Sequence, residues 1–299
     1  MKPKIVVVLG PTATGKSGLA VKIARKFQSE IISADSRQVY RGMNLGSGKI
    51  TKKEMLGIPH HLLDIISPKN TFSVVEYKKQ AEKEIEKIIT KNKIPIICGG
   101  TGFYIDSIVK NIVLPEVKID KKLRKKLEKY SVEKLFTMLN KLSSRRAEDI
   151  DKNNKVRLIR AIEIAKTLGD VPEIKEMPNK YDFILIGLDT NNKILKEKIQ
   201  KRLLARMKLG MVSEVKNLHK KGVSWKRLES FGLEYRQVAL FLQNKITKEQ
   251  LIENLKKEIW NYVKRQRTWF KRNKNIEWFE PKDSNKILGY LKNKIQIFE

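Results

Sequence analysis

Gly10-Pro11-Thr12-Ala13-Thr14-Gly15-Lys16-Ser17 is the stretch of sequence that decides the fold. It follows the apolar run Ile5–Leu9 and precedes a helical pattern that begins at Leu19, so a buried strand, a glycine turn and a helix start follow one another. This order is the context of a phosphate-binding P-loop. The glycines let successive backbone N–H groups point inward, and the helix N-terminus adds a positive partial charge. In such a loop Lys16 binds the terminal phosphates and the Ser17 hydroxyl ligates Mg²⁺.

Short apolar strands alternate with helical patterns from Lys4 to about Asn111. We expect a strand at Ile31–Ser33 that ends at Asp35, an amphipathic helix over Val74–Lys91, and a strand at Ile94–Cys98. Such alternation is typical of an α/β fold with a parallel sheet, and ligands of these sheets bind beyond the carboxyl ends of the strands. The loops that follow Leu9, Ser33 and Cys98 are therefore predicted to converge on one crevice.

The pattern changes near Val113. The segment from Asp120 to about Leu168 is helical by spacing, strongly basic and without a strand candidate, whereas Tyr181–Leu188 again reads as a buried strand. Helices are expected in all that follows. We therefore divide the chain into a first part of the core (residues 1–112), an all-helical insertion (residues 113–180) and a return to the core with basic C-terminal helices (residues 181–299).

The charge balance of the 299 residues is extreme, with 64 Lys and Arg against 33 Asp and Glu and a net charge of +31. A bias of the proteome toward lysine explains part of this excess, but a surface so basic favours a nucleic-acid partner. No apolar run reaches the roughly 20 residues that cross a bilayer. The single Cys98 excludes an internal disulfide framework, and the N-terminus lacks the pattern of a secretory signal. We expect a cytoplasmic monomer without membrane contact.

Polar residues follow the predicted strands at the crevice. Asp35 is placed to act as a general base or as an outer-sphere partner of Mg²⁺, although an aspartate there also suits a turn. Gly99-Gly100-Thr101-Gly102 permits close backbone approach, and Thr101 offers a hydroxyl to a phosphate or a substrate; an ordinary tight turn is the alternative. The strand before it does not end in the acidic residue of common P-loop ATPases. His60 and His61 are adjacent and lack a third ligand at a suitable spacing, which favours a structural role over metal binding.

Two basic tracts remain. One lies in the insertion, and the other, Lys256–Lys274, interleaves aromatic residues with lysine and arginine. Charges on a helix face are often only solvated, but aromatics among cations also suit phosphate neutralisation beside base stacking. We assign the charges to RNA contact and most of the aromatics to the core.

These motifs together resemble the tRNA dimethylallyltransferase family. The resemblance runs through most of the chain, in the family's order: the P-loop, Ala34–Met43, Pro59–Asp64, Gly99–Tyr104, Arg157–Glu163, Tyr235-Arg236-Gln237 and Lys264–Phe270. It implies a P-loop NTPase-like parallel sheet flanked by helices, with a helical insertion. The implied reaction transfers a dimethylallyl group from dimethylallyl diphosphate to N6 of the adenosine immediately 3′ of the anticodon (position 37) and releases pyrophosphate. The loop then holds a leaving group rather than ATP.

The resemblance also implies a role for individual residues. The catalytic residues would be Asp35, which takes the N6 proton, Thr101, which lies near the base, and Arg202, which clamps the diphosphate. Gly10, Pro11, Thr12, Ala13, Thr14, Gly15, Lys16 and Ser17 would bind the diphosphate, with Ser17 on Mg²⁺. The tRNA anticodon stem-loop would contact Asp35, Ser36, Arg37, Gln38, Thr101, Arg124, Val156, Arg157, Leu158, Ile159, Arg160, Tyr235 and Arg236.

The sequence departs from the family's pattern at three places: Gly46-Ser47-Gly48-Lys49, Asn191-Asn192-Lys193 and Phe231–Glu234. Three other functions remain as alternatives. A small-molecule kinase shares the loop and the sheet, a non-catalytic RNA-binding protein could use the loop as an anion cradle, and a prenyltransferase for free adenine nucleotides is a close variant. The kinase and the nucleotide prenyltransferase leave the basic insertion unexplained.

Overall fold

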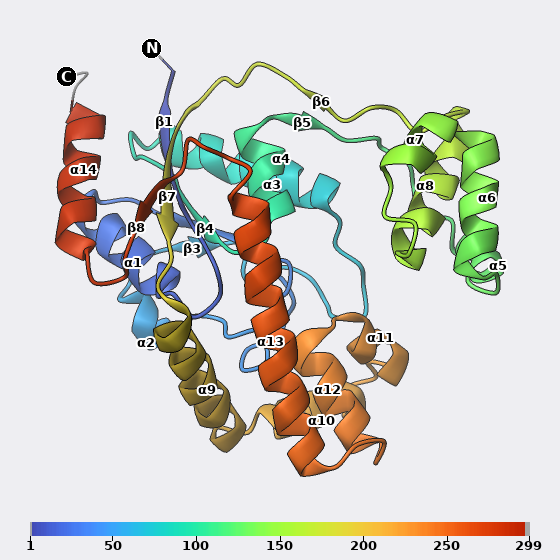
Figure 1. Cartoon of the computed structure of the whole chain (residues 1–299). Helices are drawn as coiled ribbons and strands as arrows, with labels where there is room; N and C mark the ends of the chain where they lie inside the picture. The colour runs from blue at the N-terminus through green and yellow to red at the C-terminus, as the bar shows by residue number, and fades with distance from the viewer. Residues whose placement is uncertain (1, 297–299) are drawn as a thin grey trace. The chain divides into compact units, whose positions relative to one another are not determined.

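Six parallel strands form the central sheet of the protein, whose computed structural model describes residues 2–296 (Figure 1). Their order across the sheet is β3 (His60–His61), β2 (Ile31–Ala34), β4 (Ile96–Gly99), β1 (Lys4–Leu9), β7 (Asp182–Leu188) and β8 (Glu277–Phe279). Every pairing between neighbours is parallel. The predicted α/β class with a parallel sheet is confirmed.

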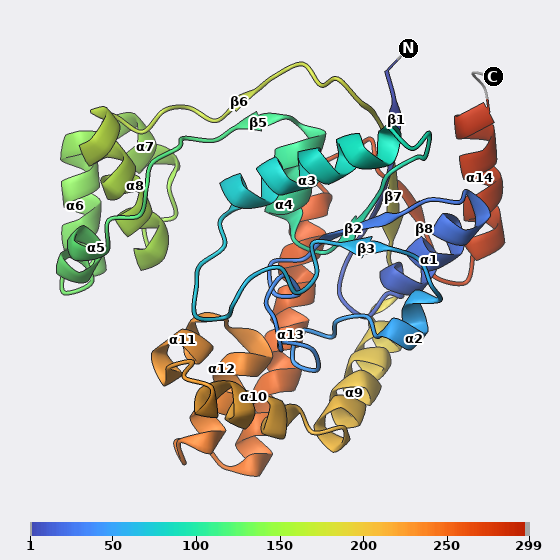
Figure 2. The same cartoon turned by 180° about the vertical axis from the view of Figure 1, so that it is seen from behind.

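Both faces of the sheet are covered by helices, because side chains alternate along each strand. Ile5, Val7 and Leu9 pack with residues of α3 (Val74–Ile89) and α4 (Gly102–Val109), whereas Val6 and Val8 pack with α1 (Lys16–Lys26) and α14 (Ser284–Gln296). Figure 2 shows α3 and α4 on the side of the sheet away from α1 and α14. The apolar runs therefore become strands that are buried on both faces.

A group of helices follows β7 and packs around a core of its own. It consists of α9 (Asn192–Lys208), α10 (Met211–Lys220), α11 (Trp225–Ser230), α12 (Leu233–Leu242) and α13 (Lys248–Phe270). Val39, Tyr40 and Met43, which follow β2, belong to the same core, so these helices lie against the loops at the carboxyl ends of the strands. The short α2 (Lys52–Met55) lies before β3.

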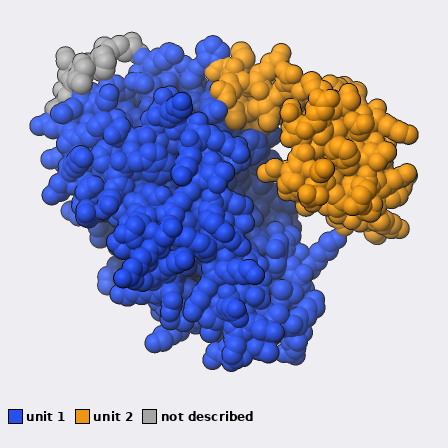
Figure 3. All heavy atoms as spheres, viewed as in Figure 1, with its two compact units in different colours: residues 1–111, 178–299 blue, residues 112–177 orange. Residues whose placement is uncertain are grey.

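The chain divides into two compact units, residues 1–111 with 178–299 and residues 112–177 (Figure 3). The second unit contains α5 (Lys121–Leu127), α6 (Val132–Leu142), α7 (Ser144–Asp149), α8 (Lys155–Leu168) and an antiparallel pair of β5 (Ile112–Val113) with β6 (Lys175–Glu176). Leu135, Leu139, Leu158 and Ile162 are fully buried in its core. Each unit thus has a hydrophobic core of its own.

The structure differs from the expectations mainly at short strands. The expectation of an all-helical insertion is wrong, since β5 and β6 pair at its two ends. The expectation that only helices follow residue 188 is wrong, since Glu277–Phe279 forms β8 on the edge of the sheet. Strands of two or three residues are too short to show a periodic pattern. The strand expected from Ile94 begins at Ile96, after Pro95, which has no N–H for the ladder. No helix among the described residues is long and apolar enough to cross a membrane.

Candidate functional site

The P-loop adopts a backbone that its glycines make possible. Gly10 has φ +135°, and a Cβ there would lie 2.2 Å from the carbonyl oxygen of Leu188 on the neighbouring β7. Gly15 has φ +91° and is the N-cap of α1, whose first turn carries no acidic residue. The exposed Ser17 lies in this turn. The loop therefore presents helix N–H groups and a hydroxyl to an anion.

Lys16 is the cation of this loop. Its Nζ donates a hydrogen bond to the carbonyl oxygen of Pro11, which also accepts from Thr14 Oγ1 at 2.9 Å. Burial, with a contribution from nearby Arg202, lowers the pKa of Lys16 to about 8, although Asp35 and Asp189 oppose this shift. The pKa of Lys16 therefore depends on charged groups that follow β2 and β7 and on one in α9.

Asp35 and Thr101 lie on two neighbouring loops that are bonded to each other. Asp35 Oδ1 accepts the backbone N–H groups of Arg37 at 2.8 Å and Gln38 at 3.2 Å, so the aspartate does serve the turn. Asp35 Oδ2 takes no part in that turn. Thr101 Oγ1 accepts the Ser36 N–H at 3.0 Å and lies 3.4 Å from Ser36 Oγ. The turn fixes the direction of the Asp35 carboxylate and leaves one oxygen available for a substrate.

Gln266 of α13 joins the P-loop to the loop of Thr101. Its Oε1 accepts the Thr12 N–H at 2.9 Å, and its Nε2 donates to the carbonyl oxygen of Gly100 at 2.8 Å. The side chain is 4% exposed. A Cβ at Gly100 would lie 2.4 Å from Gln266 Nε2, so only glycine leaves room for this contact. One buried amide thus sets the distance between the two loops.

Arg202 of α9 approaches the same region from another side. Its Nη2 lies 2.8 Å from the position that a Cβ would take at Gly48, a residue with φ +62°. Arg206, one turn later, donates from Nη1 to the carbonyl oxygens of Leu45 at 3.0 Å and Gly46 at 3.2 Å. Two arginines therefore lie against the loop of residues 44–48, which overlaps the first departure from the family pattern, Gly46-Ser47-Gly48-Lys49.

The second departure, Asn191-Asn192-Lys193, also has local partners. Asp189, at the end of β7, forms two hydrogen bonds of 2.8 Å with Arg267, and Arg267 also donates to Asn192 Oδ1. Asn191 caps α9 through its side chain, which accepts the Ile194 N–H at 2.9 Å. Asn191 and Asn192 thus organise the start of the helix that carries Arg202.

Four residues of the first unit that are predicted to contact tRNA lie in different environments. Ser36 and Gln38 are half-buried beside Asp35, and Arg37 Nε donates to the carbonyl oxygen of Phe231 at 2.7 Å. Arg236 is exposed, and its Nε donates to Glu229 O at 3.2 Å. All four belong to the loop after β2 or to the helical group that packs on it.

Tyr235 differs from these residues, because only 2% of it is exposed. A Cβ at Gly46 would lie 2.6 Å from Tyr235 Cζ, so the ring packs directly on that glycine. Its hydroxyl donates to Glu214 Oε1 at 2.9 Å. In this structure the side chain points into the protein, and an RNA contact by it would require the ring to leave the core.

In the second unit, two of the predicted tRNA contacts hold a buried acid. Glu163 is 1% exposed and accepts from Arg124 Nη2 at 2.6 Å, from Arg124 Nε at 3.0 Å and from Arg160 Nη1. Burial raises the pKa of Glu163, but the hydrogen bonds from both arginines overcome this effect and lower it. Arg124 and Arg160 are therefore partly neutralised by an internal partner.

The neighbouring residues of α8 divide by helical face. Val156 is 76% exposed and Arg157 is also exposed, whereas Leu158 and Ile159 are buried in the core of the unit. Only the first two present side chains that a ligand reaches without disturbing the core.

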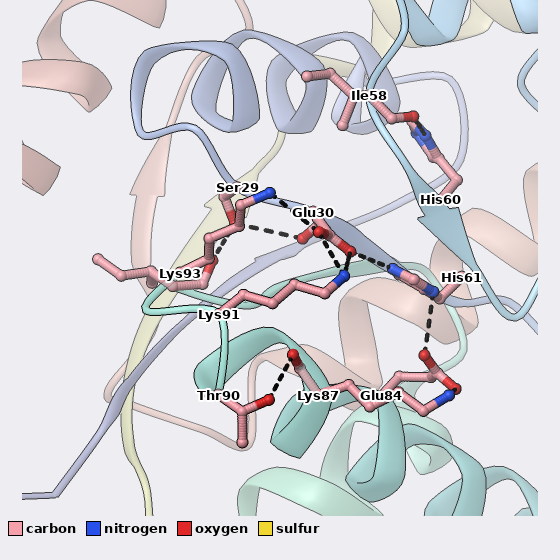
Figure 4. A network of polar contacts seen from close by, with 11 residues as sticks. Ser29, Glu30, Ile58, His60, His61, Glu84, Lys87, Thr90, Lys91 and Lys93 are labelled. Atoms are coloured by element: carbon pink, nitrogen blue, oxygen red, sulfur yellow. Dashed lines mark hydrogen bonds and ion pairs between the residues drawn. The ribbon is translucent and has the colours of Figure 1, made fainter.

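His61 belongs to a network at the other end of the sheet, whereas Nδ1 of the neighbouring His60 bonds the carbonyl oxygen of Ile58 at 2.8 Å (Figure 4). His61 bridges Glu30 and Glu84 at 2.8 and 3.2 Å, and Glu30 also pairs with Lys91 and Lys93. Although burial opposes it, the bonds from Lys91, His61 and Lys93 lower the pKa of Glu30 to about 2. Glu30 directly precedes β2, so this network ties the amino ends of the strands together and lies away from the P-loop.

Sequence reasoning assigned no role to Gln266, Glu214 and Glu163. Gln266 lies within a quoted motif, but nothing in the sequence shows which loops a glutamine on a distant helix will join. Glu163 stands between Leu158 and Ala165, and an acid on the apolar face of a basic helix is a signal for a buried ion pair.

Comparisons with known proteins agree on one family. The model of the IPP transferase family matches residues 38–273. The tRNA dimethylallyltransferase 1 of Syntrophus aciditrophicus is 39% identical over 99% of this chain and 100% of its own length. The crystal structure of a tRNA isopentenylpyrophosphate transferase from Bacillus halodurans superposes with a TM-score of 0.74 at 34% identity, covering 99% of this chain and 97% of that one. A eukaryotic dimethylallyltransferase acting on tRNA shares the fold, with a TM-score of 0.84 at 24% identity over 98% of this chain and 79% of its own.

Proposed function

Because the chain belongs to the IPP transferase family, we propose that it transfers a dimethylallyl group from dimethylallyl diphosphate to N6 of adenosine 37 in tRNA. The expectation that it is a tRNA-modifying enzyme agrees with its relatives of known name. We place this activity in the cytoplasm and in a monomer, as the sequence predicts.

One arrangement supports the proposal most directly: Gln266 bonds the P-loop to the loop of Thr101, and Thr101 Oγ1 accepts the N–H of Ser36, next to Asp35. In the proposed site, Lys16 is the cation for the leaving group, Asp35 is the carboxylate for the attacking amine, and Arg202 is a second cation. A site of this composition suits a reaction in which negative charge leaves on one side and a proton leaves on the other.

The proposed reaction follows from these positions. The N6 nitrogen of the adenosine forms a bond to the allylic carbon C1, while the bond from C1 to the diphosphate oxygen breaks and its electron pair leaves with pyrophosphate. Lys16, the loop N–H groups and Arg202 stabilise the charge that develops on the leaving group. Asp35 takes the proton that N6 loses, and Thr101 orients the base. The adenosine must leave the anticodon-loop stack to reach this crevice.

Magnesium fits the residues that are present. The described residues contain no group of three or more His, Cys, Asp or Glu side chains that could hold a metal ion by themselves. Mg²⁺ prefers phosphate oxygens and water together with few protein ligands, and the exposed Ser17 hydroxyl is such a ligand. Bound there with the diphosphate, the ion would neutralise negative charge on the leaving group.

Transfer of label tests the proposal. The protein is incubated with radiolabelled dimethylallyl diphosphate, Mg²⁺ and unmodified tRNA with an adenosine at position 37, and in parallel with γ-labelled ATP. Label that enters tRNA from the prenyl donor supports the proposal. Label that moves from ATP to a small molecule, with none in tRNA, would establish a kinase instead.

A further inference from the structure

A single carboxylate, that of Glu214 in α10, is bound by three successive backbone N–H groups. Glu214 Oε2 accepts the N–H groups of Asn44 at 3.0 Å and Leu45 at 2.7 Å, and Oε1 accepts that of Gly46 at 3.1 Å. Consecutive N–H groups that converge in this way form an anion-binding nest. Here the anion comes from the protein itself, so the nest fixes the loop of residues 44–48 rather than a ligand.

Tyr235 contacts both Glu214 and the loop of residues 44–48. Its hydroxyl donates to Glu214 Oε1 at 2.9 Å, and its ring packs on Gly46. Burial beside Glu214 raises the pKa of Tyr235 well above its usual range, so the phenol remains a donor. The ring and the carboxylate together hold Gly46 in place.

The same loop determines where two arginines lie. Arg206 Nη1 donates to the carbonyl oxygens of Leu45 and Gly46, and Arg206 Nη2 donates to Glu234 Oε1 at 2.8 Å. At Gly48 a Cβ would lie 2.8 Å from Arg202 Nη2 and 3.3 Å from Arg206 Nη1. Any shift of the loop therefore moves the surface on which the Arg202 guanidinium rests.

We propose that Tyr235 and Glu214 are positioning residues that hold the loop of residues 44–48 and, through it, the Arg202 guanidinium. This inference rests on the proposed function, in which Arg202 binds the diphosphate. It assigns Tyr235, which the sequence places among the tRNA contacts, to the diphosphate side of the reaction.

Tyr235→Phe tests this assignment, because it removes only the hydroxyl. A hydrogen bond to a charged group contributes the equivalent of at least about tenfold in an equilibrium constant. We expect the KM for dimethylallyl diphosphate to rise about tenfold, while the Kd for tRNA stays unchanged. Tyr77→Phe is the matched control: Tyr77 is equally buried in the same unit, and its hydroxyl has no hydrogen-bond partner among the described residues. It should change neither constant.

Glu214→Gln is a second variant. The NH₂ group of the new glutamine would face backbone N–H groups that need an acceptor, so part of their bonding would be lost. It should raise the same KM by more than Tyr235→Phe. Calorimetry of pyrophosphate binding in the presence of Mg²⁺ compares the same variants without turnover. This measurement therefore tests the positioning role even if the wild type does not prenylate tRNA and the proposed function is wrong. Weaker tRNA binding by Tyr235→Phe at an unchanged KM for the prenyl donor would overturn the assignment. Unchanged pyrophosphate affinity in both variants would do so as well.

Discussion

Gln266→Ala should uncouple the P-loop from the loop of Thr101. The substitution removes the acceptor of the Thr12 N–H and the donor to the Gly100 carbonyl, two bonds of 2.9 and 2.8 Å around a side chain that is 4% exposed. Each buried backbone group left without a partner costs about 1–3 kcal/mol, so the free energy of unfolding should fall by about 3 kcal/mol. Because both loops face the substrates, the KM for dimethylallyl diphosphate should also rise about tenfold.

A matched control separates the two effects. Gln237 is 6% exposed and makes two side-chain bonds, to Glu258 at 2.5 Å and from Asn254 at 3.2 Å, and both of these partners belong to α13 rather than to either loop. Both alanine variants should lower stability in thermal unfolding, and only Gln266→Ala should change the KM in steady-state assays. Equal stability losses with no change in KM for either variant would refute the idea that Gln266 spaces the loops.

Three further predictions follow from the site. Burial holds the pKa of Lys16 near 8, so above that pH the binding of pyrophosphate must take up a proton, and the affinity measured by calorimetry should fall about tenfold per pH unit in the wild type. Lys16→Met should bind pyrophosphate weakly at every pH. A wild-type affinity that does not change from pH 7 to pH 9 would contradict this prediction. Asp35→Asn should lower kcat about 100-fold and weaken tRNA binding far less, because the proton acceptor is lost while the side chain keeps its size. Equal losses in both would remove the general-base role. Arg157→Ala should weaken tRNA binding and reduce the slope of log affinity against log salt concentration by about 1. Arg160→Ala should instead lower the melting temperature, because Glu163 loses a partner. A loss of stability with Arg157→Ala and a loss of tRNA affinity with Arg160→Ala would show that the two roles are exchanged.

The sequence predicted the parts of the fold that depend on long apolar runs and on glycine. The strand at Ile5–Leu9 and the turn from Gly10 to Gly15 follow from burial and from backbone conformations that only glycine adopts easily. The two edge strands, β3 and β8, were missed because each owes its conformation to the strand beside it, β2 or β7, rather than to a pattern of its own.

The site was predictable where a residue directly follows a strand, as Asp35 and Thr101 do. Contacts that depend on distant helices were not predictable. Tyr235 lies next to the exposed Arg236 in the sequence, but helical geometry places one in the core and the other at the surface. Likewise, the basic character of Arg124 and Arg160 does not reveal that both face the buried Glu163.

The most direct test of the account is the position and identity of the modified nucleoside. Unmodified tRNA is incubated with the protein, dimethylallyl diphosphate and Mg²⁺, digested, and analysed by mass spectrometry beside a tRNA in which guanosine replaces adenosine 37. The proposed function predicts N6-dimethylallyladenosine at position 37 of the first tRNA and no prenylated nucleoside in the second. Prenylation of both tRNAs, or of neither while free adenine nucleotides are prenylated, would contradict it.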